Sequence, residues 1–139
     1  MEPQTEPTKP GVGKTVMVVD DSTPIRKVLA CAFLSGGFKT CIEAENGKEA
    51  IEAAKREKPD LVILDLSMPV MNGLQCAPEL RKILSPPDTP IILFTIFAQN
   101  LSPAEASHAG ISLVLDKNTP VLTLVEKAHQ LLANSGSTS

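Results

Sequence analysis

Short apolar runs and longer helical patterns alternate five times along this chain. The apolar runs cover residues 15–20, 38–43, 61–65, 90–95 and 111–115. Most of these runs are rich in Val, Ile, Leu or Phe, which is typical of short strands buried in a parallel sheet. The segments between them have helical spacing, so the pattern predicts five β-strands connected by α-helices.

Capping residues mark where the helices are expected to begin. The expected starts follow Ser22, Asn46, Ser102 and Thr119. Such short polar side chains can accept a hydrogen bond from the first turn of a helix. The third helical pattern contains Pro78, which cannot donate a backbone hydrogen bond, so we expect that helix to kink or to begin late.

The sequence flanking this alternation is polar. Residues 1–13 and 134–139 lack apolar periodicity, and we expect both to be flexible tails. Residues 14–133 are expected to form one domain, because 139 residues match the size of a single domain. Five parallel strands with right-handed crossovers predict a doubly wound α/β fold with its ligand site at the carboxyl ends of the strands.

The composition argues against several classes of protein. The chain is 42% hydrophobic and 21% charged, has a formal net charge of −3, and contains no Trp and no Tyr. A slightly acidic chain without these aromatic residues is poorly suited to direct nucleic-acid binding. The apolar stretches are too short to cross a membrane and the N-terminus does not resemble a signal peptide, so we expect a cytoplasmic protein without membrane insertion.

The cysteines and histidines do not suggest a metal site or a disulfide framework. Cys31, Cys41 and Cys76 are widely spaced among apolar neighbours, and we expect reduced, buried thiols. His108 and His129 lie in helical patterns far apart in the sequence. We expect both to be ordinary surface or half-buried side chains.

Aspartates follow three of the expected strands, and the one after the fifth strand is Asp116. Asp20 and Asp21 end the first strand, and Asp65 ends the third. Because the carboxyl ends of parallel strands meet at one edge, these side chains would repel one another unless a cation lies between them. Oxygen ligands with room for water suit Mg²⁺, so the cluster indicates a Mg²⁺ site and phosphoryl chemistry.

Phosphoryl transfer also requires a nucleophile and groups that stabilise the transferred phosphate. The Asp65 carboxylate can attack phosphorus and become an acyl phosphate. Thr95, at the end of the fourth strand, can donate a hydroxyl hydrogen bond, and Lys117, after the fifth, can supply a positive charge. The combination of these residues carries the argument, because Thr95 and Lys117 alone are commonplace.

Four sequence motifs resemble the CheY-like receiver domain of bacterial two-component response regulators. They are VMVVDDS, LVILDLSMPVMNG, IILFT and VLDK, in this order, and the resemblance covers about residues 14–133. The resemblance implies a flavodoxin-like (βα)5 receiver fold with strand order 2-1-3-4-5. It also implies that Gly73 gives conformational freedom at the entry to the third helix.

The resemblance implies a role for each candidate site residue. Asp65 would be the phosphoacceptor and a metal ligand, with the remaining roles distributed over five other positions. The catalytic set is Asp65, Thr95 and Lys117; the metal set is Asp20, Asp21, Asp65 and Ser67, the last through its backbone carbonyl. The implied cofactor is Mg²⁺.

Several positions depart from the pattern of the family. Val114 stands where a switching Tyr or Phe is usual, and Ile96 stands where a small residue is usual. Asn118 follows Lys117 in place of a proline that forms a cis peptide. Phosphorylation is therefore better supported than the usual aromatic relay.

The resemblance implies a stand-alone response regulator that is not an enzyme acting on a separate substrate. It would accept a phosphoryl group on Asp65 from a sensor histidine kinase or a histidine phosphotransfer protein. We expect it to signal through a downstream protein partner or onward phosphotransfer, as a monomer or a weak phosphorylation-dependent homodimer.

Two alternatives remain at this point. A degenerate receiver would act as a phosphorylation-independent interaction module, and Val114, Ile96 and Asn118 motivate this possibility. A Mg²⁺-dependent phosphatase would need a further acid or base, and Glu43 is the only additional carboxylate at a strand end.

Overall fold

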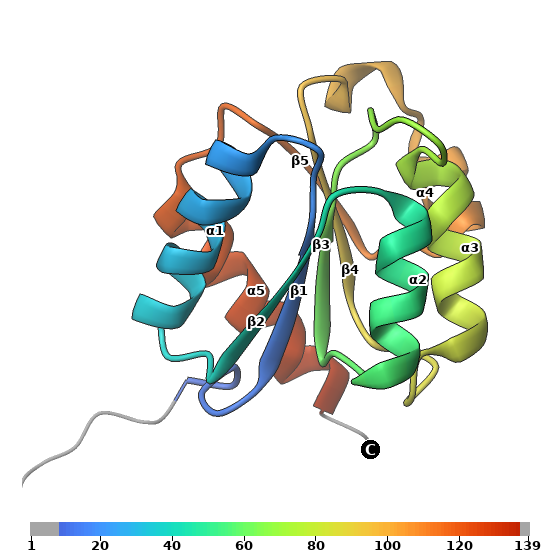
Figure 1. Ribbon diagram of the computed structural model, residues 1–139. Helices are drawn as coiled ribbons and strands as arrows, with labels where there is room; N and C mark the ends of the chain where they lie inside the picture. The colour runs from blue at the N-terminus through green and yellow to red at the C-terminus, as the bar shows by residue number, and fades with distance from the viewer. Residues whose placement is uncertain (1–8, 137–139) are drawn as a thin grey trace, which may run out of the picture.

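A computed structural model describes residues 9–136 as a five-stranded parallel sheet with helices on both faces (Figure 1). The strand order is β2-β1-β3-β4-β5, which confirms the predicted doubly wound fold. The strands are β1 (Thr15–Val19), β2 (Thr40–Ala44), β3 (Leu61–Leu64), β4 (Ile91–Thr95) and β5 (Leu113–Asp116). The helices are α1 (Thr23–Ser35), α2 (Gly47–Arg56), α3 (Gly73–Ile83), α4 (Pro103–Ala109) and α5 (Val121–Gly136), with a short 3₁₀ helix, η1 (Ala98–Asn100).

The sheet separates two hydrophobic clusters. Side chains alternate along β3, so that Val62 and Leu64 pack beneath α2, α3 and α4, whereas Leu61 and Ile63 pack beneath α1 and α5. All four side chains are buried. This explains why the central strands are apolar at every position, and it leaves the carboxyl edge of the sheet as the place where polar side chains gather.

Several strand boundaries differ by one or two residues from those predicted; β5, for example, begins at Leu113 rather than at residue 111. β2 begins at Thr40 rather than at residue 38, because Phe38 belongs to the end of α1: its N–H donates to the Phe33 carbonyl, and its ring packs edge-on against the Phe33 ring. α3 begins at Gly73 despite Pro78, because Asn72 caps it in a reciprocal pair of hydrogen bonds with Gln75. Of the two expected effects of Pro78, a kink or a late start, the late start is therefore wrong.

Part of the segment expected to be a flexible N-terminal tail forms a turn against the body of the protein. Gly11 is buried, and its N–H donates to His129 Nδ1 at 2.9 Å. The other ring nitrogen, Nε2, lies 3.0 Å from the Gly36 carbonyl and must donate to it. His129 is buried in this bridge, which differs from the expected surface or half-buried side chain.

The C-terminal boundary also differs, because α5 continues to Gly136 rather than ending at residue 133. The remainder of the expected tails, residues 1–8 and 137–139, lies outside the described part of the chain. Within residues 9–136, no helix combines the length and the apolar character that crossing a membrane requires.

The three cysteines are free thiols in different environments. Cys76 is buried and Cys41 is half-buried, and burial raises the pKa of each thiol to about 12. Cys31 is exposed, so its predicted burial is wrong. The exposed face of α1 also carries Val28 and Leu34, and apolar neighbours there do not indicate burial.

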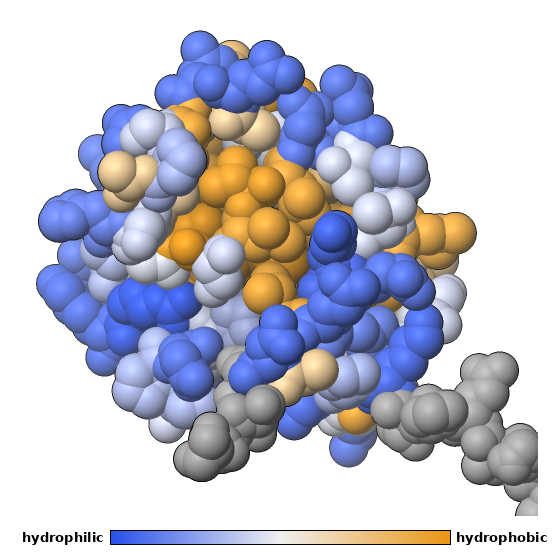
Figure 2. Space-filling model, turned by 180° about the vertical axis from the view of Figure 1, so that it is seen from behind, coloured by the Kyte–Doolittle hydropathy of each residue, from blue (hydrophilic) through white to orange (hydrophobic). Residues whose placement is uncertain are grey.

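The β5 edge of the sheet is only partly covered. Leu113, Val114 and Leu115 are all half-buried, in contrast to the fully buried side chains of β3 and β4. Figure 2, which views the molecule from behind, shows hydrophobic side chains gathered in the middle of this face. The flanking helix α4 has only seven residues and leaves much of this edge accessible.

Candidate functional site

Three strands deliver acidic and basic side chains to one point at the carboxyl edge of the sheet. Asp20 follows β1, Asp65 follows β3, and Lys117 follows β5. Carboxylate oxygens of Asp20, Asp21 and Asp65 all lie within 4.8 Å of one another. Asp20 and Asp65 are buried and Asp21 is exposed, so the cluster opens to solvent on the Asp21 side.

Lys117 links the two buried carboxylates. Its Nζ lies 2.7 Å from Asp20 Oδ2 and 3.3 Å from Asp65 Oδ2. Burial acts to lower the pKa of Lys117, but the hydrogen bond to Asp20 and the charges of Asp65 and Asp20 outweigh it, so the pKa is raised. The side chain is therefore held in its charged form.

The opposite balance applies to Asp65. Burial raises the pKa of this carboxyl group, and the Asp20 charge raises it further. The Lys117 charge and hydrogen bonds from Lys117 and the Ser67 backbone act in the opposite direction without reversing the shift. The ionised Asp65 carboxylate is thus held in an environment that another positive charge would improve.

The donor set fits Mg²⁺. When ionised, three carboxylates and one ammonium carry a net charge of about −2, which a divalent cation neutralises. All three candidate ligand side chains offer hard oxygen atoms, and this group includes neither His nor Cys. Ser67 is exposed two residues after Asp65, and its backbone carbonyl remains a predicted fourth contact.

Thr95 reaches the same edge, but its side chain is engaged locally. The residue is fully buried at the end of β4, and its Oγ1 accepts a hydrogen bond from the Phe97 N–H at 3.1 Å. Its backbone carbonyl accepts from the Lys117 N–H at 3.1 Å. The Thr95 backbone is therefore joined to the Lys117 backbone, whereas its hydroxyl oxygen is bound by a residue of the loop that follows β4.

Asn118 replaces the expected proline without displacing Lys117 from the cluster. The Asn118 N–H donates to Asp116 Oδ1 at 2.7 Å, and the Thr119 N–H donates to the Asp116 carbonyl at 2.8 Å. Asp116 therefore stabilises the turn in which Lys117 lies, a form of local hydrogen bonding typical of aspartate.

Gly73 is required for space rather than for an unusual backbone conformation. A Cβ atom at this position would lie 2.6 Å from the Asp65 carbonyl oxygen and 2.9 Å from Leu93 Cδ1. Its φ is not in the positive range, so the expected conformational freedom was the wrong reason for glycine here. The absence of a side chain lets the start of α3 lie directly against the end of β3.

Two exposed aliphatic side chains lie in the loops that follow β3 and β4. Val70 is 78% exposed and has a φ of 73°, a conformation that costs a β-branched residue about 1–2 kcal/mol. Ile96, next to Thr95, is 65% exposed. The narrowing of the site by Ile96 stays a prediction, because exposure alone does not give the direction of its side chain.

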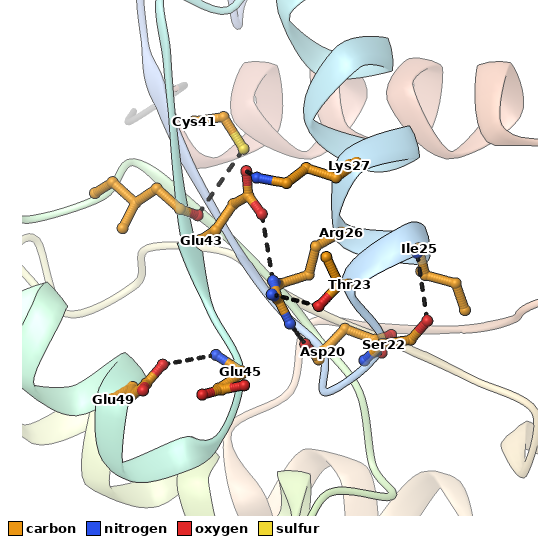
Figure 3. Close-up of polar contacts among 11 residues, drawn as sticks. Asp20, Ser22, Thr23, Ile25, Arg26, Lys27, Cys41, Glu43, Glu45 and Glu49 are labelled. Atoms are coloured by element: carbon orange, nitrogen blue, oxygen red, sulfur yellow. Dashed lines mark hydrogen bonds and ion pairs between the residues drawn. The ribbon is translucent and has the colours of Figure 1, made fainter.

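Sequence analysis missed Arg26, which lies beside the cluster (Figure 3). Its guanidinium donates to the Asp20 carbonyl at 2.7 Å and to Glu43 Oε1 at 3.3 Å. Lys27 approaches the other oxygen of Glu43 at 3.1 Å, so this carboxylate is engaged by two cations and is absent from the acidic cluster. The phosphatase alternative, which needed Glu43 as a free acid or base, loses its candidate.

One signal could have identified Arg26. A positive side chain in the first turn of a helix is electrostatically unfavourable, because the helix dipole is positive there. The first turn of α1 has no acidic residue to compensate. Such a position therefore requires an acidic partner from elsewhere in the fold, which Glu43 on β2 provides.

Comparison with known proteins agrees with this fold. The family model described as "Response regulator receiver domain" matches residues 16–129. The chemotaxis protein CheY of Thermotoga maritima is 38% identical over 99 residues, which cover 71% of this chain and 81% of that protein. The phosphate regulon transcriptional regulatory protein PhoB of Pseudomonas aeruginosa is 32% identical over 125 residues, or 90% of this chain.

A solved structure gives the same result. The chemotaxis protein CheY4 of Vibrio cholerae superimposes with a TM-score of 0.77 at 28% identity, covering 86% of this chain and 99% of that one. The chain belongs to the response regulator receiver domain family. It spans 54% of the length of PhoB, so the match to that regulator concerns only part of the larger protein.

Proposed function

We propose that this protein receives a phosphoryl group on Asp65 from a phosphohistidine of a histidine kinase or a histidine phosphotransfer protein. The observation that carries the proposal is the buried Asp65 carboxylate, grouped with Asp20 and Asp21 and paired with Lys117. Membership of the receiver family supports the same assignment.

In the proposed reaction, an Asp65 carboxylate oxygen attacks the phosphorus of the donor. A P–O bond forms, giving an aspartyl phosphate, and the P–N bond breaks with its electron pair passing to the imidazole nitrogen. The Lys117 ammonium, 3.3 Å from Asp65 Oδ2, lies where it can neutralise charge on the phosphoryl oxygens. The Thr95 hydroxyl would donate its hydrogen to the new phosphoryl group, because its contact with the Phe97 N–H engages only the oxygen as an acceptor.

Asp20, Asp21 and Asp65, with the Ser67 carbonyl, would hold Mg²⁺. The ion would supply neutralisation of the negative charge that accumulates as the phosphoryl group approaches three carboxylates. The role of the protein is to hold these oxygens close together before the donor arrives. Loss of the phosphate would follow attack of water on the same phosphorus, regenerating the carboxylate.

The output surface is proposed to be the face formed by α4, β5 and α5. It comprises residues 102–110, Val114 and residues 119–127. The half-buried hydrophobic residues of β5 and the apolar patch in Figure 2 support a protein partner on this face. Phosphorylation would act by shifting the population of two arrangements of the Thr95 loop.

Intact-protein mass spectrometry after incubation with acetyl phosphate and Mg²⁺ tests the proposal. The protein should gain the mass of one phosphoryl group, and both Asp65→Asn and removal of Mg²⁺ by a chelator should abolish the gain. Asp60→Asn is the matched control, because Asp60 lies just before the amino-terminal end of β3, whereas Asp65 lies just after its carboxyl-terminal end. It should be phosphorylated like the wild type.

A cognate kinase provides the second donor if acetyl phosphate fails. Phosphorylation by neither donor would overturn the proposal and favour a phosphorylation-independent interaction module. A phosphorylated Asp65→Asn variant would also overturn it, because the acceptor would then be another residue.

A further inference from the structure

The strongest unexplained contacts near the acidic cluster are those of Arg26. Its side chain is 11% exposed, whereas that of its neighbour Lys27 is 66% exposed. Three of its nitrogen atoms donate to different segments: Nη1 to the Asp20 carbonyl at 2.7 Å, Nη2 to Thr23 Oγ1 at 3.1 Å, and Nε to Glu43 Oε1 at 3.3 Å. Figure 3 shows the guanidinium between the β1–α1 loop and the end of β2.

We propose that Arg26 is a positioning residue for the divalent-cation site, acting on Asp21 through the peptide bond that joins it to Asp20. This inference rests on the proposed function, because it concerns how the same carboxylates hold Mg²⁺. Arg26 touches neither the donor nor the phosphoryl group in this scheme. It fixes the backbone from which a ligand projects.

The two neighbouring aspartates, Asp20 and Asp21, differ in how firmly they are held. Asp20 is held at several atoms: its N–H donates to the Ala44 carbonyl at 3.1 Å, Oδ1 accepts from the Ser22 N–H at 2.9 Å, and Oδ2 contacts Lys117. Asp21 is exposed at the open side of the cluster, where burial does not fix its orientation. Its placement therefore depends on its backbone.

The carbonyl oxygen of Asp20 belongs to the planar peptide unit that includes the Asp21 nitrogen and ends at the Asp21 Cα. Rotation of this unit about its flanking bonds would move the Asp21 side chain relative to Asp65. The hydrogen bond from Arg26 Nη1 opposes that rotation. The bond is charge-assisted and largely shielded from water, which makes it stronger than an ordinary surface hydrogen bond.

The shape of the guanidinium explains why arginine suits this position. Its planar fork offers several donors in fixed directions, so one side chain can bond the Asp20 carbonyl, Thr23 and Glu43 together. A lysine ammonium carries the same charge but concentrates its donors at one point. Glu43 offsets the charge of the arginine and ties it to β2.

Calorimetric titration of the unphosphorylated protein with Mg²⁺ tests this role. Arg26→Gln should weaken Mg²⁺ binding about tenfold, the scale found when a residue supporting a metal ligand is removed. Lys27→Gln is the matched control, because it removes the exposed cation that contacts the other oxygen of the Glu43 carboxylate. It should change the Mg²⁺ affinity less than about twofold.

Arg26→Lys separates positioning from charge and from folding, and it decides the matter if Arg26→Gln does not fold. Thermal unfolding in chelator should show that Arg26→Lys recovers stability close to that of the wild type. Its Mg²⁺ affinity should nevertheless stay several-fold weaker, because the fork is missing. Full recovery of affinity together with stability would overturn the positioning role and assign Arg26 a purely structural one.

The wild-type titration separates this inference from the proposed function. Absence of Mg²⁺ binding by the wild type would overturn the Mg²⁺ site itself. A wild type that binds Mg²⁺ and is phosphorylated, with equal affinity in both Arg26 variants, would overturn the inference alone.

Discussion

The two halves of the carboxyl edge of the sheet are held together in different ways. At the ends of β1 and β3, Asp20 and Asp65 are buried and share Lys117, a residue 97 positions from Asp20. At the end of β4, the Thr95 side chain bonds to Phe97, two residues away. The side chains of the first half are fixed by contacts between distant segments, whereas the Thr95 side chain is held within a single loop and only its backbone reaches Lys117.

This difference separates two requirements of the proposed signalling reaction. Carboxylates that hold a cation and attack phosphorus must keep their positions within a few tenths of an ångström. A loop that reports phosphorylation must change its arrangement at modest cost in free energy. Long-range contacts suit the first requirement, and the local bond of Thr95 beside the half-buried β5 edge suits the second.

The largest effect is expected at the contact that joins the first half together. Lys117→Met removes the ammonium between Asp20 and Asp65, and should slow phosphorylation by acetyl phosphate about a hundredfold. The rate is measured from the mass gain over time. Lys82→Met, which removes an exposed lysine paired with Glu79, should react at the wild-type rate. A decrease of less than about tenfold in Lys117→Met would contradict the role assigned to this ammonium.

A second way to disturb the half at the ends of β1 and β3 is to push α3 away from β3. Gly73→Ala places a Cβ atom 2.6 Å from the Asp65 carbonyl oxygen. Because that oxygen cannot move without shifting the strand, the free energy of unfolding should fall by about 2 kcal/mol. Denaturant unfolding measures this change. Gly47→Ala is the control, because the three atoms nearest to its added Cβ all belong to the Met71 side chain, at 3.0 Å, and none belongs to the backbone. An equal effect at both glycines would rule out crowding at Asp65 as the cause.

Removing the charge of Asp65 tests the electrostatic cost of placing ionised carboxylates together at the ends of β1 and β3. Because the folded state raises the pKa of Asp65, its contribution to stability is present at low pH and is lost as pH rises through the folded-state pKa. Without Mg²⁺, Asp65→Asn should therefore be more stable than the wild type near pH 8, by on the order of 1 kcal/mol. The advantage should shrink as pH falls. Unfolding curves across this range in chelator measure it, and an advantage that grows toward low pH would reverse the inferred sign.

The smallest effect is expected in the locally held half. Ile96→Ser alters a side chain that is 65% exposed, so it should change the free energy of unfolding by less than about 0.5 kcal/mol. Phosphorylation by acetyl phosphate should also proceed at nearly the wild-type rate. A severalfold acceleration would show that Ile96 restricts access to Asp65, and the contrast between the two halves would then be weaker than proposed.

The fold could be predicted because the strands carry a strong and redundant signal. β3 is apolar throughout and β4 is apolar up to Thr95, and the capping residues Ser22 and Ser102 stand immediately before their helices. The start of β2 could not be placed from the sequence, because Phe38 is as compatible with a strand as with the packed end of α1.

The acidic cluster was also predictable, since strand order alone brings Asp20 and Asp65 to one edge. The supporting contacts were not. From the sequence alone, Arg26 is an ordinary cation on a helix, and only the fold places Glu43 of β2 beside it. The burial of Gly11 likewise depends on His129, a residue 118 positions later. Periodicity reports which face of an element is buried, whereas these contacts depend on how distant elements meet.

The His129 bridge has a consequence for the order in which the molecule assembles. The bond from the Gly11 N–H closes a loop of 118 residues, and the second ring nitrogen binds Gly36 at the end of α1. The entropy of closing so long a loop favours forming it only after α1 and α5 have docked. We therefore expect the N-terminal turn to be secured after α1 and α5 have docked, and to open when α5 loosens.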